Sequence, residues 1–146
     1  MARKTNQQWI WLAICRHTRQ IVGYAIGARD EVSCRKLWQS IPVAYRRGRV
    51  YSDFWKAYQA VVPAWQHRAV AKETGHTSHI ERFNNTLRQR LARFVRKTLS
   101  FSKSLVMHEL CLRLFLWRYN ETIRQRWMLG DRGVKRFRPV RTRSNR

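Results

Sequence analysis

The stretch HTSHIERFNNTLRQRLARFVRK, residues 76–97, combines apolar and basic side chains at helical spacing. Its apolar residues recur every three or four positions, which predicts an amphipathic helix from Ser78 to about Lys97. Six Arg and Lys residues in this helix follow a single acid, Glu81. A carboxylate repels the phosphates that arginines attract. Glu81 must therefore either stabilise the start of the helix or take part in a reaction.

The chain before this helix alternates predicted strands and helices. Two runs rich in aromatic and β-branched residues, 7–15 and 20–27, flank a polar RHTR segment and predict a β-hairpin. Both alternating sets of residues in the first run are apolar, which predicts a strand covered on both faces. The segments that follow predict, in order, a helix at 31–41, a turn into a short strand at 45–53, a short helix at 54–62 and a further strand at 66–71.

The C-terminal third divides into a helix and a basic tail. LVMHELCLRLFLWRYN, residues 105–120, is more apolar than the helix before it, which predicts that it faces the core. The last residues are basic and interrupted by Gly and Pro, as is typical of a flexible tail. These patterns together predict one α/β domain over 1–127 and a tail over 128–146.

The composition is that of a folded basic protein with a polyanionic partner. The 146 residues include 31 Lys and Arg against 8 Asp and Glu, which gives a formal net charge of +23. With 44% hydrophobic residues and 7 Trp, 6 Phe and 5 Tyr, the chain can form a core, which excludes a disordered basic tail. A folded chain of this charge predicts nucleic acid as its partner, with an anionic membrane surface as the weaker alternative.

The sequence also bears on where the protein works. No apolar run approaches the roughly 20 residues of a membrane span, and the N-terminal residues lack the apolar segment of a signal peptide. The three cysteines, Cys15, Cys34 and Cys111, have no metal-type spacing, which indicates free thiols in a reducing compartment. We therefore expect a cytoplasmic protein that does not act at a membrane.

Two carboxylates, Asp53 and Glu81, each have two interpretations. Asp53 follows a predicted strand and precedes a helix, where an acid commonly serves as N-cap. Glu81 stands three residues after Ser78, so that SHIE fits a capping box. The alternative is that both acids hold one Mg²⁺, because a carboxylate at a strand end and another on a following helix can approach a cation from two sides. The residue pattern leaves both interpretations open.

The histidines and tryptophans give weaker signals. His76 and His79 lie near Glu81, but no cysteine accompanies them, which disfavours a structural zinc site and leaves a role in positioning or proton transfer open. Trp55 and Trp65 lie on or near short polar-flanked segments and are candidates for stacking on bases. The other tryptophans that we consider fit core faces: Trp9, Trp11, Trp38 and Trp117.

Two blocks of the sequence resemble the catalytic domain of transposases of the insertion-sequence-one family. They are VYSDFWKAY at 50–58 and HTSHIERFNNTLRQRLARFVRKTLSFSKS at 76–104, and H-x-E-R-x-N-x-x-L-R within the second is highly specific. The resemblance runs from about Gln7 to Asn120. It implies a bacterial DDE-type enzyme with an RNase H-like core, which uses Mg²⁺ or Mn²⁺ to cleave phosphodiester bonds at transposon ends and to join them to target DNA.

The same resemblance assigns roles to individual residues. It makes Asp53 and Glu81 the second and third catalytic acids, both as metal ligands. It implies that polar and basic residues of the helix contact DNA: Arg82, Asn84, Asn85, Arg88, Arg90, Arg93, Arg96 and Lys97. The partners that it implies are transposon-end and target DNA, together with a second copy of the chain or a full-length transposase, at the bacterial nucleoid.

The chain departs from the family at its N-terminus. In the family the first catalytic Asp lies on a strand just before the hairpin, whereas this chain begins at MARKTNQQWIW. Asp30 and Glu31 stand where capping is the ordinary role of an acid. We therefore expect residues 1–127 to form a truncated RNase H-like domain that lacks its first central strand and is catalytically defective alone. The alternative is a non-catalytic, basic nucleic-acid-binding module that modulates an intact transposase.

Overall fold

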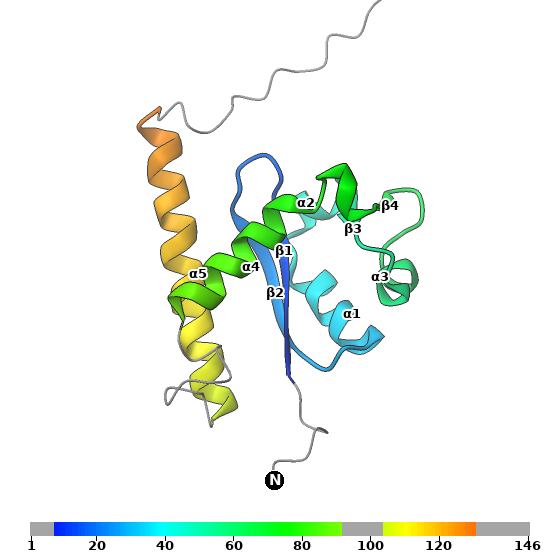
Figure 1. Ribbon diagram of the computed structural model, residues 1–146, viewed down its shortest axis with the longest axis horizontal. Coiled ribbons are helices and arrows are strands. Elements are labelled where there is room, and N and C mark those ends of the chain that lie inside the picture. Colours follow the sequence, from blue (N-terminus) through cyan, green and yellow to red (C-terminus); the bar gives the residue numbers. More distant parts are fainter. Residues whose placement is uncertain (1–7, 92–103, 131–146) are drawn as a thin grey trace, which may run out of the picture.

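A computed structural model describes residues 8–91 and 104–130 and gives an α/β arrangement (Figure 1). The predicted order of strands and helices is confirmed, and one short helix, α2, is added. In chain order the elements are β1 (Trp9–Ile14), β2 (Ile21–Gly27), α1 (Glu31–Ser40), α2 (Val43–Arg46), β3 (Val50–Ser52), α3 (Lys56–Val61), β4 (His67–Ala69), the 3-10 turn η2 (Lys72–Thr74), α4 (Ser78–Arg90) and α5 (Leu105–Met128).

The strands form two separate sheets of two strands each. β1 and β2 make the predicted antiparallel hairpin, with Trp9 opposite Gly27 and a bulge between Ala13 and Ile14. β3 and β4 are parallel, with Val50 opposite His67. Among the described residues β1 pairs only with β2, and β3 pairs only with β4. One edge of β1 and one edge of β3 therefore have no partner strand in this part of the chain.

Helices cover both faces of the hairpin, as the sequence predicts (Figure 1). On one face α1 and α3 pack over a cluster centred on Trp11, with Ala25, Cys34, Leu37 and Ala57. On the other face α4 and α5 pack over a second cluster: Ile21, Phe83, Leu87, Leu112 and Leu116. Alternate residues of β1 serve the two clusters, because successive side chains of a strand point to opposite faces.

α4 begins at Ser78 as predicted, but its C-terminal limit and its N-cap residue differ from the prediction. The helix ends at Arg90, not near Lys97, because Leu91 takes an extended conformation (φ −111°, ψ 92°) while its N–H still donates to the Leu87 carbonyl. At the other end Thr77 is the N-cap and Ser78 is already helical, so that the predicted capping box is wrong. Residues 92–97 lie outside the described residues.

The prediction that the last helix faces the core is right for one of its faces only. Leu112, Leu116 and Ile123 are buried, with Leu112 fully inaccessible. A second apolar stripe lies on the opposite side of α5 and is exposed: Val106, Leu110, Leu114 and Trp117. Trp117 is 64% exposed, so its predicted core position is wrong, as is that of Trp9, which is also exposed.

The predicted tail falls almost wholly on residues 131–146, outside the described part. No helix in 8–91 or 104–130 is long and apolar enough to cross a membrane.

Candidate active site

One large cleft, of about 1080 Å³, lies between the hairpin and the second sheet and extends to the N-terminus of α4. Every residue of β1 and every residue of β3 lines it. Successive side chains of a strand point to opposite faces of a sheet, so a cavity over one face would be lined by every second residue only. Because every residue of both strands lines this cleft, the cleft runs along the edges of the strands. These are the edges that lack a partner strand among the described residues.

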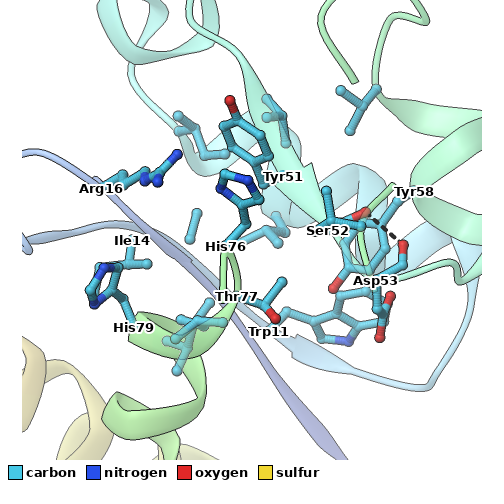
Figure 2. A pocket seen from close by; sticks show the side chains of 18 of the residues that line it. Trp11, Ile14, Arg16, Tyr51, Ser52, Asp53, Tyr58, His76, Thr77 and His79 are labelled. Atoms are coloured by element: carbon cyan, nitrogen blue, oxygen red, sulfur yellow. Dashed lines mark hydrogen bonds between the residues drawn. The ribbon is translucent and has the colours of Figure 1, made fainter. Parts of the chain in front are cut away.

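Asp53 follows β3 directly and lines the cleft with an exposed side chain (Figure 2). Its Oδ1 accepts a hydrogen bond from the Trp55 N–H at 3.2 Å. Trp55, not Asp53, is the N-cap residue of α3, so the predicted N-cap role of Asp53 is wrong, and the carboxylate closes a turn ahead of the helix. The buried Ser52 fixes the backbone here, because its hydroxyl donates to the Asp53 carbonyl at 2.9 Å and lies 2.7 Å from Nε2 of His67.

Glu81 reaches the same cleft from the first turn of α4. Its backbone N–H donates to the Thr77 carbonyl at 3.2 Å, and its Oε1 accepts a hydrogen bond from the Thr77 hydroxyl at 3.3 Å. The carboxylate is therefore aimed by Thr77, one residue before the predicted cap. The two acids that the sequence singles out thus come from different elements and line one cleft.

The acids leave most of their oxygens available to a cation. Within the described ranges the ion pairs are Arg35 with Glu31 and Arg124 with Glu121, and neither site acid takes part in one. Glu73 of η2 also lines the cleft, a third carboxylate that sequence patterns do not distinguish because it stands in no motif. No three His, Cys, Asp or Glu residues of the described part lie close enough to hold one ion. Carboxylate oxygens are the kind of ligand that Mg²⁺ prefers, and this ion usually keeps several waters besides its protein ligands.

Aromatic side chains form the wall of the cleft beside Asp53. The rings of Trp11 and Trp55 stack at 5.0 Å, and Tyr58 contacts both edge to face. The guanidinium of Arg29 lies 4.9 Å from the Trp55 ring centre. Burial raises the pKa of Tyr58, and the Asp53 carboxylate raises it further, so the phenol remains a protonated donor close to that acid. Trp55 is thus engaged within the protein, whereas Trp65 is 71% exposed.

The predicted DNA-contacting residues of α4 are placed only in part. Of these, Arg82, Asn85, Arg88 and Arg90 are exposed on the helix. Asn84 is half-buried and lines the cleft one turn after Glu81. Arg93, Arg96 and Lys97 lie outside the described residues.

The two acids at the start of α1, Asp30 and Glu31, are not part of this cleft. Asp30 caps α1, and its Oδ1 accepts a hydrogen bond from the Ser33 N–H at 2.8 Å. This hydrogen bond lowers the pKa of Asp30. Glu31 pairs with Arg35 at 2.7 Å. Neither acid lines the cleft, which confirms the capping role expected of Asp30.

Comparison with known proteins identifies the family of the chain. The family model for IS1 transposase matches residues 1–122. Insertion element iso-IS1n protein InsB of Shigella dysenteriae is 36% identical over 115 residues, which are 77% of this chain and 83% of that protein. Insertion element IS1 protein InsB of Shigella flexneri is 35% identical over 106 residues, which are 73% of this chain and 78% of that protein.

A third similar protein, insertion element IS1 4 protein InsB of Escherichia coli (strain K12), is 33% identical over 106 residues, which are 73% of this chain and 61% of that protein. No solved structure matches the chain significantly. The family match spans both β3 and α4, and hence both acids of the cleft. The chain belongs to the IS1 transposase family, a family of DDE transposases.

Proposed function

We propose that Asp53 and Glu81 are metal-binding acids of a transposase site that cleaves DNA and transfers its strands in transposition. The observation that carries this proposal is that the two carboxylates, one after β3 and one on α4, line a single cleft. Bound Mg²⁺ or Mn²⁺ would supply a Lewis acid for a phosphoryl oxygen and a water that deprotonates readily. DNA is the partner that the net charge of +23 favours.

The chain's own residues hold the two carboxylates in place. The Trp55 N–H orients Asp53, and the Thr77 hydroxyl orients Glu81. The Ser52 hydroxyl fixes the end of β3, because it donates a hydrogen bond to the Asp53 carbonyl and contacts the ring of His67 on β4. Positioning of this kind matters, because metal-assisted displacement depends on ligands that stay within a fraction of an ångström of their working positions.

We further propose that residues 1–127 are part of an RNase H-like core in which one more extended segment fills the cleft between β1 and β3. β1 and β3 border the cleft, and on that side neither pairs with another strand of residues 8–91 and 104–130. Buried backbone groups without partners cost about 1–3 kcal/mol each, so a pairing strand would be strongly favoured there. A full-length transposase or a second copy of the chain could provide this segment, and with it a further acid.

Nicking of supercoiled plasmid DNA with Mg²⁺ or Mn²⁺ tests the proposed function. Two acids hold a cation loosely, so we expect slow Mn²⁺-dependent nicking and no joined product from this chain alone. Asp53→Asn and Glu81→Gln should each reduce nicking to the metal-free background. Glu121→Gln, which removes an acid on α5 away from the cleft, is the matched control and should nick as the wild type does.

The outcomes separate the transposase from the alternative. Nicking that survives both cleft substitutions would contradict the proposal, as would clear joined product in the absence of another protein. DNA binding without any metal-dependent nicking would instead favour a non-catalytic, basic nucleic-acid-binding module that modulates an intact transposase.

A further inference from the structure

The outer face of α5 is an apolar surface that the rest of the described chain leaves uncovered. Figure 1 shows α5 along one side of the molecule, with the hairpin and the other described elements on its inner side. Four apolar residues spaced one helical turn apart are each at least half exposed on its outer side: Val106, Leu110, Leu114 and Trp117. These four residues form the outer stripe of α5. Contiguous apolar surface of this kind on a folded protein commonly marks an interaction site.

A groove of about 290 Å³ joins the outer stripe to the outer edge of β2. Four consecutive residues of β2, 21–24, line this groove together with Arg113 and Trp117 of α5. In the described part of the chain β2 pairs with β1 alone, and Asn120 satisfies the backbone groups of Ile21 on the other side. The apolar surface therefore continues from a helix to an open strand edge, and such an edge is a template for another chain.

This surface is uncharged overall in a chain whose formal net charge is +23. The seven residues of β2 include no charged side chain. Residues 105–117 contain one acid, Glu109, and one base, Arg113, so their charges cancel while His108 is neutral. DNA would find no electrostatic attraction here. Two copies of so basic a chain repel each other wherever their arginines meet, and on this surface they can approach without that repulsion.

The surface also has the size that a dimer needs. α5 has 24 residues and is therefore about 36 Å long. With the groove and the edge of β2 the surface is about 20 Å wide, so it offers on the order of 700 Å². Stable interfaces bury about 800 Å² on each partner and have an apolar, aromatic centre with a polar rim. Trp117 lies near the middle of α5, and the ion pair of Glu121 with Arg124 lies toward its C-terminal end.

We propose that a second copy of this chain docks on the outer stripe of α5 and the adjoining edge of β2 to form a twofold-symmetric dimer. A twofold axis presents the same surface from both partners, so each apolar stripe is covered by the other. Two antiparallel α5 helices would then bury Leu114 and Trp117 of both chains. The cleft borders the free edge of β1, which is the opposite edge of the hairpin, so the dimer does not depend on the metal site proposed there.

Analytical ultracentrifugation of the full chain, treated with nuclease and kept in high salt, measures the oligomeric state without DNA. We expect a monomer–dimer equilibrium for the wild type. Leu114→Glu and Trp117→Glu bring like charges together in an apolar interface and should each weaken dimerisation by roughly 100-fold or more. Trp65→Glu is the matched control, because Trp65 is exposed to a similar extent, 71% against 64% for Trp117, but lies between α3 and β4. It should dimerise as the wild type does.

Thermal unfolding of the same proteins separates an interface from a role in the fold. The wild-type Tm should rise with protein concentration, because the dimer stabilises the folded chain. Leu114→Glu and Trp117→Glu should keep the wild-type circular dichroism spectrum and have a Tm that does not change with concentration. A wild-type chain that stays monomeric up to about 100 µM would overturn the proposal. A dimer that persists in both variants would also overturn it, because that dimer must use another surface.

Discussion

Asn120 of α5 and Ile21 of β2 are joined by two hydrogen bonds across the domain. The Ile21 N–H donates to Asn120 Oδ1 at 2.8 Å, and Asn120 Nδ2 donates to the Ile21 carbonyl at 2.8 Å. Both backbone groups therefore point away from β1, and the side-chain amide takes the place of a neighbouring strand. This pair ties the last helix to the outer edge of the hairpin.

Replacing Asn120 should destabilise the fold. Asn120→Ala leaves an N–H and a carbonyl of Ile21 unpaired, so we expect a loss of about 1–3 kcal/mol in the free energy of unfolding. Urea denaturation followed by circular dichroism measures it. Gln125→Ala, at an exposed position on the same helix, is the control and should change the free energy by less than about 0.5 kcal/mol. Equal effects of the two substitutions would show that the pair does not hold α5.

The two apolar faces of α5 should differ sharply in their contribution to stability. Leu112 is fully buried, so Leu112→Ala should cost about 2–5 kcal/mol. Leu114 is 59% exposed on the other face, and Leu114→Ala should change stability by less than about 0.5 kcal/mol. The same urea titration compares them, on protein dilute enough to be monomeric. A large loss in Leu114→Ala would mean that the outer face is covered within the monomer.

Acidification should lower the stability of the fold through its histidines. Burial lowers the pKa of both His67 and His79 from the ordinary value of 6.5, so the folded state holds them neutral. Below about pH 6.5 the unfolded chain binds these protons first, so the free energy of unfolding falls as the pH drops and is fully present above that value. The Tm should therefore decrease from about pH 7.5 to about pH 5.5. His67→Gln should flatten this decrease, and a Tm that rises on acidification would contradict the assignment.

DNA binding should be strong, weakly sequence-selective and steeply dependent on salt. The motivation is the net charge of +23 and the row of exposed arginines on α4. If about 6 phosphates are neutralised, log K should fall against log salt with a slope of about −5. Anisotropy titrations with two unrelated duplexes measure both properties, and a flat salt dependence would rule out phosphate contacts as the main source of affinity.

The sequence predicts the elements well where the apolar pattern is strong. The continuous apolar run of β1 and the helical spacing of apolar residues in α4 both mark real elements, because burial on both faces produces the first pattern and burial on one face produces the second. It fails at helix ends, since whether Thr77 or Ser78 caps α4 depends on the loop that precedes the helix. The sequence also does not show which of the two apolar stripes of α5 is buried, because either one could face the core.

The residues of the candidate site also fall into two groups, those that a sequence motif marks and those that no motif marks. Asp53 and Glu81 stand in motifs, so the sequence alone singles them out. Glu73 stands in none, and only the tertiary fold brings it to the cleft.

The most direct test of whether Asp53 and Glu81 share one cation is a double-mutant cycle of Mn²⁺ affinity. Electron paramagnetic resonance of free Mn²⁺ would measure binding to the wild type, Asp53→Asn, Glu81→Gln and the double variant. If the two carboxylates hold the same ion, each single substitution weakens binding and the double variant binds little more weakly than either one, because removing one ligand already disables the site. Single substitutions that leave Mn²⁺ affinity unchanged, or losses that simply add in the double variant, would contradict a shared metal site.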